Sequence, residues 1–551
     1  MKKIYLMIVG TLFATTSLAQ VTFPTKANAE KATSTVAKEK LRTRLKFNLA
    51  NAVSKRHAKT GTPITKQPEG TVMDTFYRSS SESYFIGWGS VFRMPVDGFV
   101  GTLVKGTDGS LYMADPFAML ASNTWLKLDK ADGDTLVAKA NQMVFQVEYE
   151  DGARYDFYAS HMVARQTEEG ELTYVIDPDD ADIKFVFRND SLIQLGDGII
   201  GMHSEEGEWA GYGDMHTVFS TVRDQVVEAS PSLAFTDYVM KFMSASGGKD
   251  GQIVKVAFDG DNVYLKGTSP NMPEAMILGR IDGNKLVFDS EQYMGIDKVT
   301  QSHAYFFGGT AHVVHNDEYD IDEELFFLTK SLTFKYDAAN RQMTADSAVC
   351  VNTGKKLMAY IYFFKQPDMG VFTEMPLTPQ QPTIISFSKF DPEMGYATLL
   401  FEYPKFDAEG RFMNPEKLTY KIFRDNEELT FYPDEYIKLE TETNEMPYNY
   451  DDRSRVFVNE SAHSVCIFED GYDKIGVLCI YRGGNETHES PMAWHAVNGE
   501  TGVDTVNTGE IETSHYIDMQ GRAVQHPAQG IYVRMDRLKN GSKKYTKVLV
   551  R

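Results

Sequence analysis

Apolar and polar residues alternate along most of this chain in short segments. The segments at 144–149 (VFQVEY) and 332–336 (LTFKY) place every second side chain on the same face, which is the period of a half-buried strand. Asp-Gly pairs such as 108–109 and 259–260 separate such segments and are typical of hairpin turns. Long helical periodicity is absent beyond about residue 60. The pattern predicts a mainly β protein built from antiparallel hairpins.

The order of turns and strands between residues 100 and 142 recurs between residues 254 and 292. Each stretch has an Asp-Gly turn, a strand ending in tyrosine, a proline, a second strand and another Asp-Gly turn. Each then has a glutamine nine residues beyond the second glycine, Gln142 or Gln292. A repeated unit would produce this frame, so the sequence predicts two related β-lobes at 75–245 and 246–378. The alternative is a chance similarity between two hairpin-rich stretches.

Residues 382–496 follow a short linker, Gln380-Gln381-Pro382, and contain about seven strand-like segments. Their lengths and turn spacing are those of an antiparallel β-sandwich. In this outline the segment resembles a fibronectin type III-like domain, although no tryptophan occurs in an early strand to anchor the core. The resemblance implies a module that spaces or binds and seldom catalyses.

The first residues have the order of charges and apolar groups that a secretory signal peptide needs. Lys2 and Lys3 precede an apolar run at 4–13, and Ser17-Leu18-Ala19 ends it with small residues just before Gln20. The run is too short for a stable membrane span, and no cysteine follows the expected cleavage site. We therefore predict a signal peptide at 1–19 that is cleaved between Ala19 and Gln20. The alternative is a buried first strand or helix.

Residues 20–74 form a basic leader in an otherwise acidic chain. Between residues 26 and 59 there are ten Lys or Arg and two Glu. Apolar residues recur at helical spacing from Val36 to Val53, which predicts an amphipathic helix over about 35–56. A basic helix can lie on a membrane or on an acidic partner. The alternative is that it packs beside the acidic body of its own chain.

The last residues, 515–551, follow a polar connector at 497–514 and resemble the C-terminal sorting modules of Bacteroidota proteins exported by the type IX system. The resemblance rests on three elements: YIDMQGR at 516–522, GIYV at 530–533 and the Lys-rich strand KVLV at 547–550. It implies a small β module that an export machinery recognises. An insertion at 537–544 departs from the family pattern and would interrupt the last hairpin. The lobes are also similar to segments of uncharacterised secreted proteins of that phylum, which implies no activity.

The charge of the chain argues against two classes of partner. The formal net charge is −21, and removal of the two lysines in residues 1–19 gives −23. Nucleic acids and anionic membranes are bound by Lys and Arg that neutralise phosphate, so neither is expected to bind the acidic body. No later stretch approaches about 18 uninterrupted apolar residues, so no transmembrane segment is expected.

No motif with known catalytic or metal-binding chemistry occurs. The sequence has no Gly-x-Ser-x-Gly, no His-Glu-x-x-His, no phosphate-binding glycine loop and no cysteine pair at zinc spacing. His312 and His315 precede several carboxylates, but in a strand they would face opposite sides. The acidic run at 177–182 lacks the glycine and the distal glutamate of a calcium loop, so we expect a solvated turn. No catalytic residue, metal or cofactor is assigned.

Aromatic residues beside glycines and carboxylates are candidates for ligand binding. The stretch 208–214 (EWAGYGD) combines Trp209, Tyr212 and Asp214 with bare glycine backbone, and Trp88 and Trp125 are further candidates. Flat aromatic faces next to hydrogen-bond acceptors suit sugar rings. The alternative is that these rings pack into the core of their own lobe.

Cys466 and Cys479 lie at equal distances from the turn expected at 472–473, which would place them opposite each other in a hairpin. Such a pair comes close enough for a disulfide when the two residues are not hydrogen-bonded, and export leads to an oxidising compartment. Cys350 would then be unpaired and buried. The alternative is two free thiols, and a turn shifted by one residue would place the sulfurs on opposite faces.

These features favour a secreted or cell-surface multidomain β protein that binds a glycan or an extracellular protein without catalysis. If the C-terminal module is not read as an export signal, the expected location is the periplasm. A secreted hydrolase is one alternative, because the two carboxylates of a glycosidase can come from any part of a fold. A structural spacer is the other.

Overall fold

The computed structural model describes residues 61–73, 75–87, 90–148, 154–167, 172–245, 247–316, 321–392, 394–497, 511–518, 523–524, 530–538 and 543–550. These residues are mainly β-strand and include no α-helix, which confirms the prediction of a mainly β protein. Four predictions lie outside the described residues: the signal peptide at 1–19, its cleavage site at Ala19 and Gln20, the leader helix at 35–56, and Trp88. The chain divides into two compact units, residues 1–372 and 373–551.

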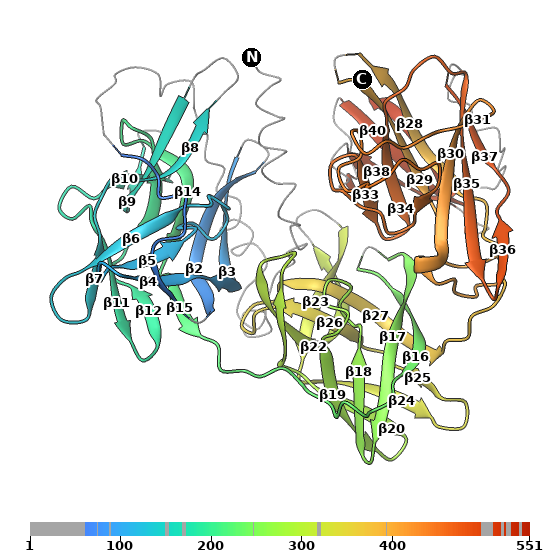
Figure 1. The fold of residues 1–551 in the computed structure, drawn as a ribbon, viewed down its shortest axis with the longest axis horizontal. Coiled ribbons are helices and arrows are strands. Elements are labelled where there is room, and N and C mark those ends of the chain that lie inside the picture. Colours follow the sequence, from blue (N-terminus) through green and yellow to red (C-terminus); the bar gives the residue numbers. More distant parts are fainter. Residues whose placement is uncertain are drawn as a thin grey trace. The chain divides into compact units, whose positions relative to one another are not determined.

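The first part of unit 1, residues 61–235, is a curled sheet that we call barrel 1 (blue to green in Figure 1). Its ring begins with β2 (Phe76–Gly87) and β3 (Ser90–Gly101), and β3 continues along the chain into β4 (Leu103–Gly106). From β4 the pairing runs through β5 (Leu111–Ala114), β6 (Trp125–Lys130), β7 (Thr135–Ala138), β11 (Ile183–Arg188), β12 (Ser191–Gln194) and β15 (Val218–Thr221), which returns to β2. The remaining strands are β1 (Gly70–Val72), β8 (Gln142–Glu148), β9 (Arg154–Gln166), β10 (Leu172–Ile176), β13 (Ile199–His203) and β14 (Trp209–Met215).

The second part of unit 1, residues 236–372, is barrel 2 (green to yellow in Figure 1). Its ring runs through β16 (Thr236–Met243), β17 (Lys249–Asp259), β18 (Asn262–Lys266), β19 (Met276–Asp282), β20 (Lys285–Asp289), β24 (Ser331–Asp337), β25 (Gln342–Thr344) and β27 (Tyr360–Val371), which closes on β16. The remaining strands are β21 (Gln292–Asp297), β22 (Ser302–Asn316), β23 (Ile321–Thr329) and β26 (Ala348–Thr353). Since β16 pairs within this ring, the strands of the second lobe begin at Thr236 and not at residue 246.

The two barrels have the same order of strand pairing. In barrel 1, β9 pairs with β8, β10 and β13, and in barrel 2 β22 pairs in the same way with β21, β23 and β26. Gln142 and Gln292 also make the same contacts. The side-chain amide of Gln142 pairs with both backbone groups of Lys127 at 2.9 and 2.8 Å, and that of Gln292 pairs with Leu278 at 2.7 and 2.9 Å.

Each barrel has its own apolar core because alternate residues of its strands point inward. In β6, for example, Leu126 and Leu128 are fully buried between more exposed neighbours. In β19, the strand of barrel 2 equivalent to β6, Ile277 is fully buried between more exposed neighbours and belongs to a separate cluster. The Asp-Gly turns place glycine at positive φ, as at Gly260 (φ 59°) and Gly283 (φ 60°), a conformation that favours glycine.

The two barrels meet through backbone contacts. A Cβ atom on Gly98 would lie 2.3 Å from the backbone N of Gly354. Because neither residue has a side chain, the two backbone segments can touch. The carboxylate of Asp97 in barrel 1 accepts hydrogen bonds from the N–H groups of Lys355 (2.9 Å) and Lys356 (2.7 Å) in barrel 2. Unit 1 is therefore one body made of two similar barrels.

Unit 2 begins with a two-sheet sandwich. One sheet has the order β28 (Thr383–Asp391), β29 (Tyr396–Glu402), β34 (Ala462–Ile467), β33 (Val456–Asn459). The other has the order β31 (Glu427–Glu428), β30 (Leu418–Arg424), β35 (Lys474–Gly483), β36 (Glu486–Glu489), with β32 (Met446–Pro447) on β30 and β37 (Ala493–Ala496) on β35. A core rich in tyrosine fills the space between the sheets.

The segment predicted as a linker, 380–382, packs on this sandwich. The side chain of Gln380 donates to the backbone O of Phe406 and of Asp407, both at 2.9 Å. Leu377, upstream of it, is already part of the sandwich core. The sandwich therefore includes residues before 382.

The C-terminal sheet has the order β39 (Ala523–Val524), β38 (Ile511–Asp518), β40 (Gly530–Leu538), β41 (Lys543–Val550). Its first strand begins at Ile511, inside the expected connector. Arg537 pairs with Lys543 and Asp536 with Lys544, so the residues expected to interrupt the last hairpin extend it. The turn at 519–522 lies outside the described residues.

Candidate ligand-binding face of the sandwich

The structure places the residues of the 208–214 candidate site inside barrel 1. Trp209 is 8% exposed and Asp214 is 1% exposed. The indole ring of Trp209 lies edge-on to Tyr84 (5.6 Å between centroids) and to Tyr174 (5.0 Å), and its N–H donates to the backbone O of Tyr212. Burial raises the pKa of Tyr212 to about 12. These positions correspond to the core-packing alternative.

Asp214 has a structural contact that accounts for its burial. Its carboxylate forms a 2.6 Å ion pair with Arg78, which is also buried, and accepts a 2.7 Å hydrogen bond from the N–H of Ala118. Arg78 in turn donates to the backbone O of Asp115 and Pro116. Asp214 thus fixes the loop between β5 and β6. Trp125, at the start of β6, is half-buried, and its N–H bonds to the backbone O of Ile64.

The two cysteines predicted as a pair lie on different sheets of the sandwich. Cys466 is on β34 and Cys479 on β35; β34 pairs with β29 and β33, whereas β35 pairs with β30. Cys479 belongs to the core, while Cys466 alternates with the core residues Val465 and Ile467 and so faces the other side of its sheet. The expected hairpin between them is not formed, and all three cysteines are free thiols.

The acidic run at 177–182 is a turn whose carboxylates bind protein donors. Asp177 accepts from the N–H of Asp179 (3.0 Å), and Asp182 accepts from the N–H of Ala140 (2.9 Å) and from Lys139 (2.8 Å). His312 and His315 lie on β22, where a separation of three residues places them on opposite faces. Among the residues that the structure describes, no group of three or more His, Cys, Asp or Glu could hold a metal ion.

Two serine–histidine contacts in barrel 1 have the atom types of a nucleophile and a base. Ser160 and His203 are 2.9 Å apart, but both are fully buried. Ser81 and His216 are 3.0 Å apart at the surface, and His216 lies 3.8 Å from Asp197, whose side chain is completely exposed. A carboxylate at that distance and in full solvent would not fix the imidazole ring. Neither contact therefore supports a catalytic site.

The outer face of the second sandwich sheet combines an exposed aromatic residue with ordered polar groups. On β30, Thr419, Lys421 and Phe423 alternate with core residues and therefore point outward. Cross-strand pairing places Phe423 beside Gly476 of β35, and Gly476 beside Trp494 of β37. This face, with Glu445 and Arg482, was not found from the sequence.

Trp494 lies over a glycine. A Cβ atom on Gly476 would be 2.7 Å from the indole ring, so the side chain of any other residue would displace the ring. Phe423 contacts the ring edge-on at 6.4 Å, and the Lys474 ammonium lies 4.1 Å from its centroid. Trp494 is nevertheless 42% exposed. A glycine inside a strand indicates close approach of another group, and Gly476 was the sequence signal for this site.

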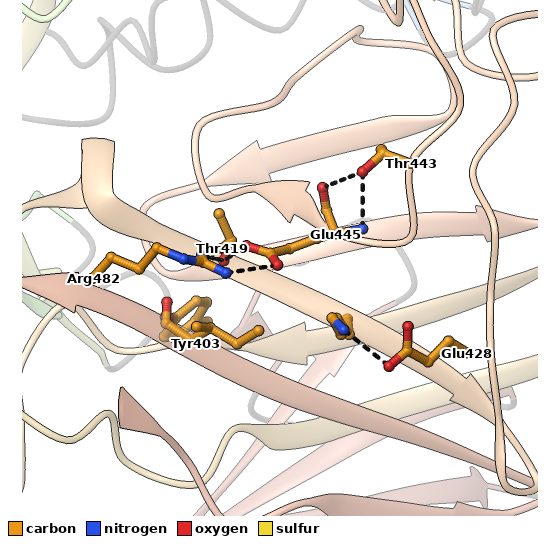
Figure 2. Close-up of polar contacts among 8 residues, drawn as sticks. Tyr403, Thr419, Glu428, Thr443, Glu445 and Arg482 are labelled. Carbon is orange, nitrogen blue, oxygen red and sulfur yellow. Dashed lines mark hydrogen bonds and ion pairs between the residues drawn. The ribbon is translucent and has the colours of Figure 1, made fainter. Parts of the chain in front are cut away.

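Figure 2 shows the ordered polar groups on the same face. Arg482 forms a bidentate ion pair with Glu445, with the second N–O contact at 2.8 Å, and also donates to the Thr419 hydroxyl at 3.1 Å. Thr419 donates to Glu445 at 2.5 Å, and the backbone N of Glu445 is held by Thr443. On the next row, Lys421 is 2.9 Å from Glu428.

The charges in this network are fixed. Burial alone would raise the pKa of Glu445, but the hydrogen bonds from Arg482 and Thr419 outweigh it and hold this pKa below its usual range. The bond to Glu445 raises the pKa of Arg482. Both groups therefore stay ionised near neutral pH, and they present donors and acceptors in a rigid arrangement.

The chain has no match among models of known protein families or among curated proteins. Among its described residues, no helix is long and apolar enough to cross a membrane.

Proposed function

We propose that this chain is an exported, non-catalytic binding protein whose sandwich holds a glycan on the face defined by Phe423, Gly476 and Trp494. The observation that carries the proposal is the 42% exposure of Trp494, which packs over Gly476 with the Lys474 ammonium 4.1 Å from its ring centroid, on the sheet face that also carries the Lys421–Glu428 and Arg482–Glu445 pairs. A sugar ring offers a C–H patch surrounded by hydroxyls, so an aromatic ring with donors and acceptors beside it is complementary.

The charges of the face favour a neutral glycan over an anionic one. Lys421 is paired with Glu428 and Arg482 with Glu445, and Lys474 contacts both Trp494 and the side-chain oxygen of Asn426 (3.3 Å). An acidic sugar would have to separate one of these pairs and would meet the remaining carboxylate. Neutral hydroxyls can bridge a paired cation and anion without breaking the pair.

Export is supported by the sequence features at both ends. The order of lysines, apolar run and small residues at 1–19 is that of a signal peptide, and residues 515–551 resemble type IX sorting modules. The sandwich suits the role of a fibronectin type III-like binding module. Export is tested by sequencing the N-terminus of the exported protein, which should begin at Gln20. Deletion of residues 516–551 should retain the protein in the periplasm.

Binding is tested with Trp494→Ala on arrays of neutral and anionic oligosaccharides, followed by calorimetry of the strongest ligand. We expect a loss of about tenfold or more in affinity, since an aromatic contact contributes about 0.5–1.5 kcal/mol beyond its buried area. Phe457→Ala is the matched control because Phe457 is 53% exposed on β33 of the other sheet. Unchanged binding by Trp494→Ala would contradict the proposal, and release of reducing sugar would favour the hydrolase alternative.

A further inference from the structure

The aromatic and the polar groups of the proposed glycan face lie along one strand. The residues of β35 that alternate with its core residues and point outward are Gly476, Leu478, Ile480 and Arg482. Trp494 covers Gly476 at one end of this row, and Glu445 pairs with Arg482 at the other end. From residue 476 to residue 482 a strand rises about 20 Å, since each residue adds about 3.3 Å. The row is therefore longer than a single sugar ring.

The neighbouring strand, β30, accompanies this row with outward side chains of its own. Cross-strand pairing joins the outward residues of the two strands in three pairs: Phe423 with Gly476, Lys421 with Leu478, and Thr419 with Ile480. Figure 2 shows the polar groups that follow β30, from Arg482 at one end to Glu428 toward the other. We call these two rows, together with Trp494, the outer track. It has an aromatic end and a polar end on one continuous sheet face.

The ion pairs of the outer track keep hydrogen-bonding capacity for neutral groups. The guanidinium of Arg482 has five N–H groups, and its bonds to Glu445 and Thr419 occupy three of them. The ammonium of Lys421 has three, and its bond to Glu428 occupies one. Within the described part of the chain, the other N–H groups of these two side chains have no partner. Hydroxyl groups of a ligand can therefore accept from them while both ion pairs stay intact.

We propose that the outer track binds an extended, neutral, β-1,4-linked oligosaccharide along β35, with one sugar ring on Trp494 and a later ring at Arg482. This inference rests on the proposed glycan-binding function and adds the shape and length of the ligand. The paired charges favour a neutral chain, because an anionic chain would separate one of the pairs. The straight row favours an extended chain, since a β-1,4-linked chain is a flat ribbon whereas an α-1,4-linked chain curves away from a strand. A row of about 20 Å has the length of roughly four rings.

The first test is calorimetry of the full-length protein with β-1,4-linked oligosaccharides of glucose, xylose and mannose, from disaccharides to hexasaccharides. In at least one series the affinity should rise about tenfold or more from the disaccharide to the tetrasaccharide, because the longer chain gains the bonds at Arg482. It should then level off, since further rings extend past the track. The curved α-1,4-linked glucose series should show no such rise. Affinity independent of length, an equal rise in the α-1,4 series, or no binding of any β-1,4 series would overturn the proposal.

The second test compares Arg482→Ala with Trp494→Ala. Arg482→Ala should lower the affinity for the tetrasaccharide about tenfold, because it removes hydrogen bonds from a charged donor at the polar end. It should leave the affinity for the disaccharide unchanged, because Trp494 still holds that ligand. Trp494→Ala should weaken both ligands. The control is Lys389→Ala, which removes an exposed cation from β28 of the other sheet and should bind both ligands like the wild type.

The two variants separate this inference from the function on which it rests. If Trp494→Ala loses affinity while chain length and Arg482→Ala have no effect, glycan binding stands and the extended ligand is overturned. If Trp494→Ala binds every oligosaccharide as the wild type does, both proposals fail. Circular dichroism verifies that Arg482→Ala folds, and the length series on the wild type needs no variant.

Discussion

Barrel 1 and barrel 2 have the same strand order but hold their equivalent loops by different chemistry. In barrel 1 the loop between β5 and β6 is fixed by the buried ion pair of Arg78 and Asp214. In barrel 2 the loop between β18 and β19 is fixed by Asn271, which donates to Asp297 (2.7 Å) and accepts from Tyr362 (2.9 Å). The same topology thus allows this loop to be fixed either by a buried ion pair or by an asparagine side chain.

Both barrels keep the glutamine that binds the backbone of one strand, and they differ in the side chains that fix the loop. Gln142 and Gln292 satisfy backbone groups of the strand next to the loop, and both barrels keep them. The side chains that fix the loop itself differ, because any donor and acceptor of suitable reach can do this. The loss of unfolding free energy on removing these side chains should differ as well, since leaving a buried charge unpaired costs far more than leaving an amide unpaired.

The largest effect is expected from Asp214→Ala in barrel 1. The substitution leaves the Arg78 guanidinium buried without its carboxylate, which costs about 3–5 kcal/mol in the free energy of unfolding. Asn271→Ala in barrel 2 leaves only neutral or partly satisfied groups and should cost about 1–3 kcal/mol. Urea denaturation measures both. Equal losses would show that the ion pair is not the distinguishing feature, and the double variant R78M/D214L should recover stability if it is.

A second difference lies in the hairpins of β9–β10 and β22–β23. In barrel 1, Trp209 packs with Tyr84 and Tyr174 over β9 and β10, whereas Val313 on β22 is 69% exposed. Trp209→Ala should therefore cost about 3–5 kcal/mol, and Val313→Ala should change stability by less than about 0.5 kcal/mol. Thermal unfolding distinguishes the two. A small effect of Trp209→Ala would remove the evidence for a core role and restore the ligand hypothesis for this residue.

The matched pair Gln142→Ala and Gln292→Ala tests what the barrels share. Each substitution removes hydrogen bonds to both backbone groups of one strand residue, so each should cost about 1–2 kcal/mol. The two losses should be similar. A loss in only one barrel would mean that the shared geometry does not have a shared role.

The sequence predicted the features that depend on local chemistry. Alternation of apolar residues gave the strands, the Asp-Gly pairs gave the turns, and the spacing of Gln142 and Gln292 indicated two stretches whose contacts the structure shows to be equivalent. The strands of residues 382–496 also follow from local patterns.

Features that depend on pairing between distant strands could not be predicted. Cys466 and Cys479 are close in sequence, but their strands belong to different sheets. Arg482 meets Thr419, 63 residues away, only because β35 lies beside β30. Trp209 faces inward and Trp494 outward, and this direction depends on which neighbour each strand acquires, since a shift of one residue reverses every side chain.

The smallest effect is expected from pH, at a position where the barrels differ. On β22, His303 lies three residues before Phe306, the cross-strand partner of Gln292. On β9, Asp156 lies three residues before Ala159, the cross-strand partner of Gln142. His303 is 1% exposed, stacks on Tyr77, and faces Tyr293. Its Nε2–H donates to the backbone O of Phe76 (3.1 Å), and its Nδ1 accepts from Tyr293, which fixes the neutral tautomer.

Burial lowers the pKa of His303, although the hydrogen bond to Phe76 and the nearby Asp224 act in the opposite direction. The unfolded chain, with an imidazole pKa of about 6.5, then binds the proton more tightly than the folded chain. The stability contribution of His303 is therefore complete above about pH 6.5 and is lost as the pH falls below that value. His303→Gln should flatten the pH dependence of unfolding between about pH 7 and pH 5, because the glutamine amide donates and accepts without titrating. Asp156→Asn, the matched change in barrel 1, should leave the slope in place because it retains His303. If the dependence of the unfolding free energy on pH is unchanged in His303→Gln, this histidine does not make the stability of the barrel junction sensitive to pH.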